Sequence, residues 1–148
     1  MNKGGQDKAL HNLDYLAAKH AQKIIEKTKR KKPGDVDNTV TKALGVLQEN
    51  GVYACFLYLL AKEKDNGGNV VISKMLNLLG ELPFDWGKPD DNSPEKVLKH
   101  ISEKVTVDLE RLLLAKETLE QMLIYARYGA KARSKETDSM SSGQEKAE

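Results

Sequence analysis

Apolar residues in this chain recur at steps of three and four, which is the spacing of one face of an α-helix. The pattern begins in residues 8–31, where no glycine or proline interrupts it, and returns in later segments. Its first apolar positions are Leu10, Leu13, Ala17, Ala21, Ile24 and Ile25. No alternating pattern is long enough to build a sheet. The chain is therefore predicted to be all-α, a single-domain bundle of about five or six helices.

Proline, glycine and capping residues divide the pattern into helices. Lys-Lys-Pro-Gly ends the first helix, and Asp37, Asn38 and Thr39 offer N-caps for the second. Asn50-Gly51 closes the second helix, because both residues tolerate the left-handed conformation. Together these signals predict helices over 8–31, 38–49, 52–64 and 70–81, a helix of about ten residues from Ser93-Pro94, and a last helix from about Thr106 to Ala132.

Segment 52–64 is apolar nearly all round, which is typical of a central core helix. A buried strand is the competing interpretation, but the length of the segment and its Ala and Leu content favour a helix. The two ends of the chain lack any apolar period. We therefore expect disordered ends over 1–7 and 133–148, with the bundle domain spanning 8–132.

Composition and apolar run length exclude several classes of protein. The longest apolar run covers Val52 to Ala61, whereas a bilayer-spanning helix needs about 20 apolar residues. The segment from Met1 to Asp7 contains no apolar signal core. Cys55 is the only cysteine, so neither a disulfide scaffold nor a cysteine-based zinc finger is expected. These features predict a soluble, cytoplasmic protein without membrane partners.

The sequence contains no recognisable arrangement of catalytic or metal-binding residues. His11, His20 and His100 lack the spacing and the acidic partner of a metal site. Cys55 lies in the most apolar segment, without a nearby cation to lower its pKa. Gly67-Gly68 lacks the lysine and hydroxyl of a phosphate-binding loop. We therefore expect no catalytic residue, no metal and no cofactor; a small enzyme with an unseen cofactor is the weakest alternative.

Basic residues give the clearest functional signal. Residues 1–33 carry a net charge of +6, whereas residues 34–93 carry −4. Cations on the first helix step by three or four, and a second group lies beside Tyr125 and Tyr128 on the last helix. The predicted RNA-binding residues are Lys19, Lys23, Lys27, Arg30, Lys31, Arg127 and Lys131. The competing interpretation is a solvated basic surface whose lysines complement the helix dipole.

Two stretches carry a resemblance to a known family. The first runs Leu47-Gln-Glu-Asn-Gly-Val-Tyr-Ala-Cys-Phe-Leu-Tyr-Leu-Leu-Ala-Lys62. The second is the last helix, with Asp108-Leu109, Thr118-Leu119-Glu120 and Tyr125-Ala-Arg-Tyr-Gly-Ala-Lys131. With the Ala17-x-x-x-Ala21 pattern, they resemble the small α-helical subunit of the type III-B CRISPR effector, the Cmr complex. The chain departs from this family in its last helix, where Ile124 replaces a frequent tryptophan.

The resemblance implies a non-catalytic subunit that lines up in several copies beside larger backbone subunits and faces the guide–target duplex. Its implied partners are other CRISPR effector subunits, guide RNA and target RNA, together with weak self-association. Asn50-Gly51 and Phe56 would be residues of the fold. The alternatives are the small subunit of the related type III-A complex and a helical protein–protein adaptor that never contacts nucleic acid.

Overall fold

The computed structural model describes residues 12–147 and the side chains of residues 12–136. As predicted, the described chain is an all-helical single domain of six α-helices without a strand. The predicted disorder of residues 1–7 and the positions of Leu10 and His11 lie outside the described residues. The helices are α2 (Leu13–Lys27), α3 (Pro33–Asn50), α4 (Val52–Lys62), α5 (Asn69–Glu81), α6 (Pro94–His100) and α7 (Leu109–Ala147). Between them lie η1 (Lys64–Gly68), a kinked connection in which Gly67 has φ of 92°, and η2 (Ile101–Val105), a short π-helical segment.

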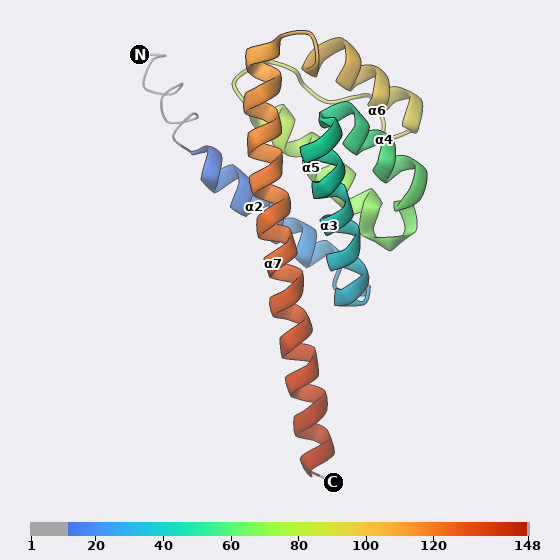
Figure 1. Ribbon diagram of the computed structural model, residues 1–148, viewed down its shortest axis with the longest axis vertical. Helices are drawn as coiled ribbons and strands as arrows, with labels where there is room; N and C mark the ends of the chain where they lie inside the picture. The colour runs from blue at the N-terminus through green and yellow to red at the C-terminus, as the bar shows by residue number, and fades with distance from the viewer. Residues whose placement is uncertain (1–11, 148) are drawn as a thin grey trace.

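Helix α7 is the longest helix of the described chain, and α2 and α3 pack against it (Figure 1). As far as Arg133 it packs mainly against α2, α3 and the connection between them, and its remaining turns extend away from the other helices. Helices α4, α5 and α6 complete the bundle on the far side of α2 and α3, near the end where α7 begins. The two helices that carry the basic segments, α2 and α7, are therefore direct neighbours.

The core follows the predicted helical faces. Phe56 is fully buried, and so are four residues of α5 at helical spacing: Val71, Met75, Leu78 and Leu79. Helix α4 covers Val52–Lys62 of the predicted helix 52–64, so the strand alternative is excluded. From Leu112 onward an apolar stripe of α7 packs against the core, whereas Leu109 is 68% exposed. Leu109 lies in the first turn of α7, where no other helix covers it.

Helix α3 begins five residues before the predicted start. Lys32 is its N-cap in extended conformation, and Pro33 occupies the first turn, where its fixed φ suits a helix and its missing N–H costs nothing. The predicted caps Asp37, Asn38 and Thr39 therefore lie inside the helix, and that prediction is wrong. The predicted break at Asn50-Gly51 is confirmed, because Gly51 has φ of 97° between α3 and α4.

Helix α7 is longer than predicted. It continues through Ala147, so the boundary near Ala132 and the disordered tail over 133–148 do not match the described backbone. Residues 133–147 contain no proline and only one glycine, so nothing in the backbone chemistry ends the helix. The absence of an apolar period shows that this segment does not pack on a core, and it does not by itself exclude a helix.

Glu63, immediately after α4, organises the connection to α5. Its carboxylate accepts hydrogen bonds from the Tyr58 hydroxyl at 2.9 Å and the Thr39 hydroxyl at 3.2 Å. The Lys42 ammonium lies 3.6 Å away. Burial favours the neutral acid, but the hydrogen bonds from Tyr58, Asn66 and Thr39 and the Lys42 charge outweigh it and lower the pKa of Glu63. The carboxylate therefore joins α3, α4 and η1.

This arrangement predicts a pH-dependent contribution to stability. Because the folded pKa of Glu63 is below its ordinary value of 4.5, the contribution is complete above that value. It is lost as the pH falls through the lower folded pKa. Glu63→Gln should lower the free energy of unfolding by about 1–2 kcal/mol at pH 7, and by less as the solution is acidified. Urea unfolding across this pH range, with exposed Glu49→Gln as control, checks the prediction. A constant difference between Glu63→Gln and wild type at every pH would contradict it.

Candidate nucleic-acid interface

The connection between α2 and α3 is fixed against α7 by one side chain, Arg133. Its Nη1 donates to the carbonyl oxygens of Thr28 at 2.9 Å and Lys31 at 3.2 Å. Its Nη2 donates to the carbonyl oxygen of Lys29. These carbonyls lie past the last turn of α2, and the Thr28 carbonyl also accepts a hydrogen bond from the Lys31 N–H. The planar guanidinium supplies several donors at once, which an ammonium does not do in this fixed geometry.

Local contacts shape the same connection from within. Thr28 is buried, and its hydroxyl donates to the Ile24 carbonyl at 2.7 Å, which closes α2. The Lys31 ammonium donates to the carbonyl oxygen of Asp65 in η1. Gly67 packs beneath, where an added Cβ would lie 3.5 Å from Thr28 Cγ2. Residues 28–32 are thus held by α7 on one side and by η1 on the other.

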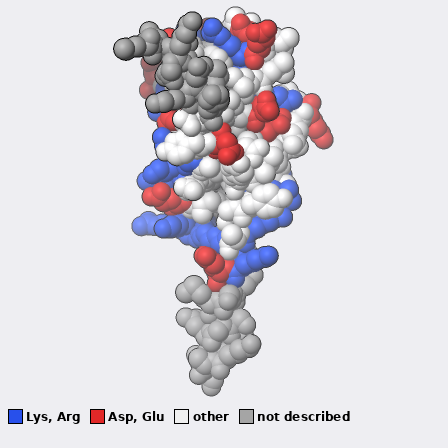
Figure 2. Space-filling model, turned by 90° about the vertical axis from the view of Figure 1, so that its left-hand side faces the viewer, with Lys and Arg blue, Asp and Glu red and all other residues white. Residues whose placement is uncertain are grey.

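The result is a concentration of positive charge that we call the basic collar. Segments 28–36 and 127–136 together carry eight Lys/Arg against two Asp/Glu. The collar comprises Lys29, Arg30, Lys31, Lys32, Lys131 and Lys135, all with exposed side chains, arranged around Arg133. Figure 2 shows Lys and Arg gathered in a band across the described surface, next to the grey atoms of the projecting end. Residues about 100 positions apart in sequence therefore form one cationic surface.

The structure separates the predicted RNA-binding residues into groups. Arg30, Lys31 and Lys131 lie in the collar. Lys19 instead pairs with Glu81 of α5 at 3.3 Å, and Lys23 pairs with Glu26 at 3.6 Å. Their contact with RNA stays a prediction, and each of the two lysines already has an acidic partner.

The remaining two predicted residues lie on other surfaces. Lys27 lines a shallow cavity with Ser73 and Lys74 of α5. Arg127 is directed toward α3, where its Nε lies 4.0 Å from Asp37. Sequence reasoning left out Lys135, because it fell in the segment predicted to be disordered. Its spacing of four residues from Lys131 was the signal that a continued helix would align the two.

The described histidines and the cysteine are buried or half-buried. His20 is buried with Nε2 3.3 Å from the Glu81 carboxylate, and burial lowers its pKa more than Glu81 raises it. Burial also lowers the pKa of His100, with Lys104 adding to the effect. Cys55 donates to the Ala43 carbonyl, and burial raises its pKa to about 12, which keeps it a thiol. Among the described residues no group of three or more His, Cys, Asp or Glu is placed to hold a metal ion.

Neither a family model nor a curated protein nor a solved structure matches the chain. No helix in the described part is both long and apolar enough to cross a membrane. The functional conclusion therefore depends on the collar and on the sequence motifs.

The Arg133 contacts predict a specific loss of stability. Arg133→Ala should lower the free energy of unfolding by about 1–3 kcal/mol, because the carbonyls at the end of α2 lose a charged donor. Arg133→Lys should recover only part of this, since an ammonium does not reproduce the planar fork. Arg30→Ala, an exposed cation of the same connection, is the matched control and should change stability by less than about 0.5 kcal/mol. Urea unfolding measures all three, and equal effects of Arg133→Ala and Arg30→Ala would contradict the prediction.

Proposed function

We propose that this chain is the non-catalytic small subunit of a type III-B CRISPR ribonucleoprotein effector, where it contacts guide–target RNA through the basic collar. The observation that carries the proposal is the collar itself, in which two distant basic segments are fixed side by side by Arg133. The alternative assignment is the small subunit of the related type III-A complex. Both assignments place the chain in antiviral defence as an RNA-contacting assembly component.

The chemistry of the collar suits the phosphate backbone of RNA. Its exposed ammonium and guanidinium groups neutralise phosphates without reading base sequence, so binding is governed by salt and independent of sequence. Within the collar, the Lys31 ammonium donates to the Asp65 carbonyl, and the central Arg133 donates to the carbonyls of Thr28, Lys29 and Lys31, so both cations are held by backbone carbonyls. That distinguishes the collar from the Lys19 and Lys23 positions, where an acid already sits beside each cation.

The motifs that carry the family resemblance support the same proposal. Gly51 takes the positive φ expected of the Asn-Gly break, and Phe56 fills the core. Both are residues of the fold, as the resemblance implies. The all-helical architecture also agrees with a small subunit of this kind.

A second surface supports contact with other subunits. Val107, Leu109 and Leu113 are 72%, 68% and 55% exposed at the start of α7. They lie at the opposite end of the bundle from the collar (Figure 1). Exposed apolar residues grouped in this way mark interaction sites on proteins. They also favour the adaptor alternative, which differs from the proposal in predicting no RNA affinity even at low salt.

The proposal predicts a salt-dependent RNA affinity that the collar controls. The triple variant Arg30→Ala, Lys32→Ala, Lys131→Ala should weaken binding of both single-stranded and duplex RNA. It should also reduce the slope of log affinity against log salt by about 2–3, because each lost phosphate contact removes roughly one unit. Fluorescence anisotropy between low and physiological salt measures both quantities.

The matched control removes the same charge from the other end of the molecule. Lys96, Lys99 and Lys104 are exposed on α6 and η2, and replacing all three by alanine should leave the salt slope of RNA binding unchanged. Equal effects of the two triple variants would show that net charge, and not the collar, sets the affinity. Absence of RNA binding by the wild type at every salt concentration would favour the adaptor.

A further inference from the structure

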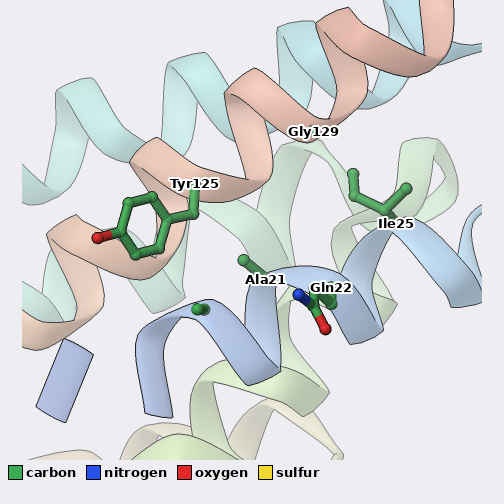
Figure 3. Close-up of a pocket in the computed structure, with 6 residues that line it drawn as sticks. Ala21, Gln22, Ile25, Tyr125 and Gly129 are labelled. Carbon is green, nitrogen blue, oxygen red and sulfur yellow. The ribbon is translucent and has the colours of Figure 1, made fainter. Parts of the chain in front are cut away.

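An open groove lies between α2 and α7, directly beside the collar. It has a volume of about 410 Å³ and is lined by Ala18, Ala21, Gln22, Ile25, Tyr125 and Gly129. In Figure 3 the Tyr125 ring lies toward one end of the groove and Ile25 toward the other, with Ala21 and Gln22 between them. The lining therefore combines an aromatic ring, an aliphatic side chain, a floor of small residues and one amide.

Gly129 lies where α2 and α7 come close along this groove. A Cβ added at Gly129 would lie 2.9 Å from Ile25 Cγ1, so either the Ile25 side chain or α2 would have to shift to admit it. Because residue 129 has no side chain and Ala18 and Ala21 are small, the groove keeps enough open space to admit a flat group. The groove has the size of a small-molecule site and is too small for a folded segment.

Tyr125 is held in a defined position at its end of the groove. Its hydroxyl donates to the Asp14 carboxylate of α2, and this hydrogen bond is the main cause that raises the pKa of Tyr125. A ring fixed at both ends offers a stacking surface that loses little entropy when a partner binds. The Gln22 amide is exposed at the mouth and carries both a donor and an acceptor.

The collar lies beyond the end of the groove that Gly129 and Ile25 form. On α7, Lys131 follows Gly129 by two residues and the central Arg133 follows it by four, and Lys29 follows Ile25 by four residues, past the end of α2. One turn corresponds to a rise of about 5.4 Å along a helix. Phosphate-binding cations therefore lie next to an apolar slot with an aromatic wall, which is the combination found where proteins bind single-stranded nucleic acid.

We propose that the groove binds one unstacked base of single-stranded RNA, which stacks on Tyr125 while the collar holds the adjoining phosphates. The inference rests on the proposed function, since it takes the RNA to be held at the collar. Gln22 contacts the edge of the base, and because every base presents donors or acceptors there, the slot is tolerant of sequence. Charge complementarity selects this occupant: an apolar segment of a partner protein would gain nothing from the cations at its side.

The test compares a short single-stranded RNA with the same ribose-phosphate chain lacking its central bases. Wild-type protein should bind the base-bearing RNA about tenfold more tightly, the usual size of one stacking contact. Tyr125→Leu removes the ring, and Ala18→Phe fills the slot. Each variant should bind the two RNAs with equal affinity, and the salt slope of binding should not change. Tyr125→Phe keeps the ring and should keep the ratio, as should Tyr53→Leu, which removes an exposed tyrosine on α4.

Anisotropy gives the affinities, and 2-aminopurine at the central position reports stacking directly as fluorescence quenching. Far-UV circular dichroism and thermal unfolding establish that each variant is folded; Gln22→Ala, at an exposed position, provides a further variant that tests the slot. Equal affinity of the wild type for both RNAs, or an unchanged ratio in folded Tyr125→Leu and Ala18→Phe, would overturn the base slot. The collar triple variant weakens both RNAs alike, so failure of the collar is seen separately from failure of the slot.

Discussion

The arrangement of the candidate interface depends on the contact between Arg133 and the carbonyls that end α2. Segments 28–32 and 131–135 are both strongly basic, and bringing them together without compensation would be repulsive. The carbonyls of Thr28, Lys29 and Lys31 lie just past the end of α2, and Arg133 places its charge on them. One cation is therefore compensated by the backbone, while the lysines around it stay exposed. Such a surface is electrostatically complementary to a polyanion.

The helices could be predicted because their signals are local. Length and the Ala and Leu content predicted the helix that became α4, and the break at Gly51 was visible as the Asn-Gly dipeptide. The errors arose where one residue serves two elements or where packing and helicity were equated. Pro33 was taken only to end the first helix, whereas it also begins α3. The end of α7 was placed where the apolar stripe stops, although a helix needs no core to continue.

The interface was less predictable for a different reason. The spacing of Lys19, Lys23 and Lys27 places them along one side of α2, but the sequence does not show which helix faces that side. The structure brings Glu81 of α5 against Lys19, and this acid lies 62 residues away in the chain. Likewise, nothing local connects Lys29 with residue 133; the contact exists only because α2 and α7 pack together. The sequence shows where charged residues cluster, but it does not show which of them pair with an acidic side chain or a backbone carbonyl.

The close approach of α2 and α7 at Gly129 links the groove to the collar. Residues 129 and 133 lie one turn apart on the same helix, so the separation of the two helices at Gly129 limits how far Arg133 must reach. A Cβ at position 129 would meet the Ile25 side chain, so that side chain or α2 would have to shift, and a shift of α2 would move the Thr28 and Lys31 carbonyls relative to Arg133. The same absence of a side chain shapes the slot beside Tyr125. Gly129 thus links the cavity that we assign to a base with the position of the cations that we assign to its phosphates.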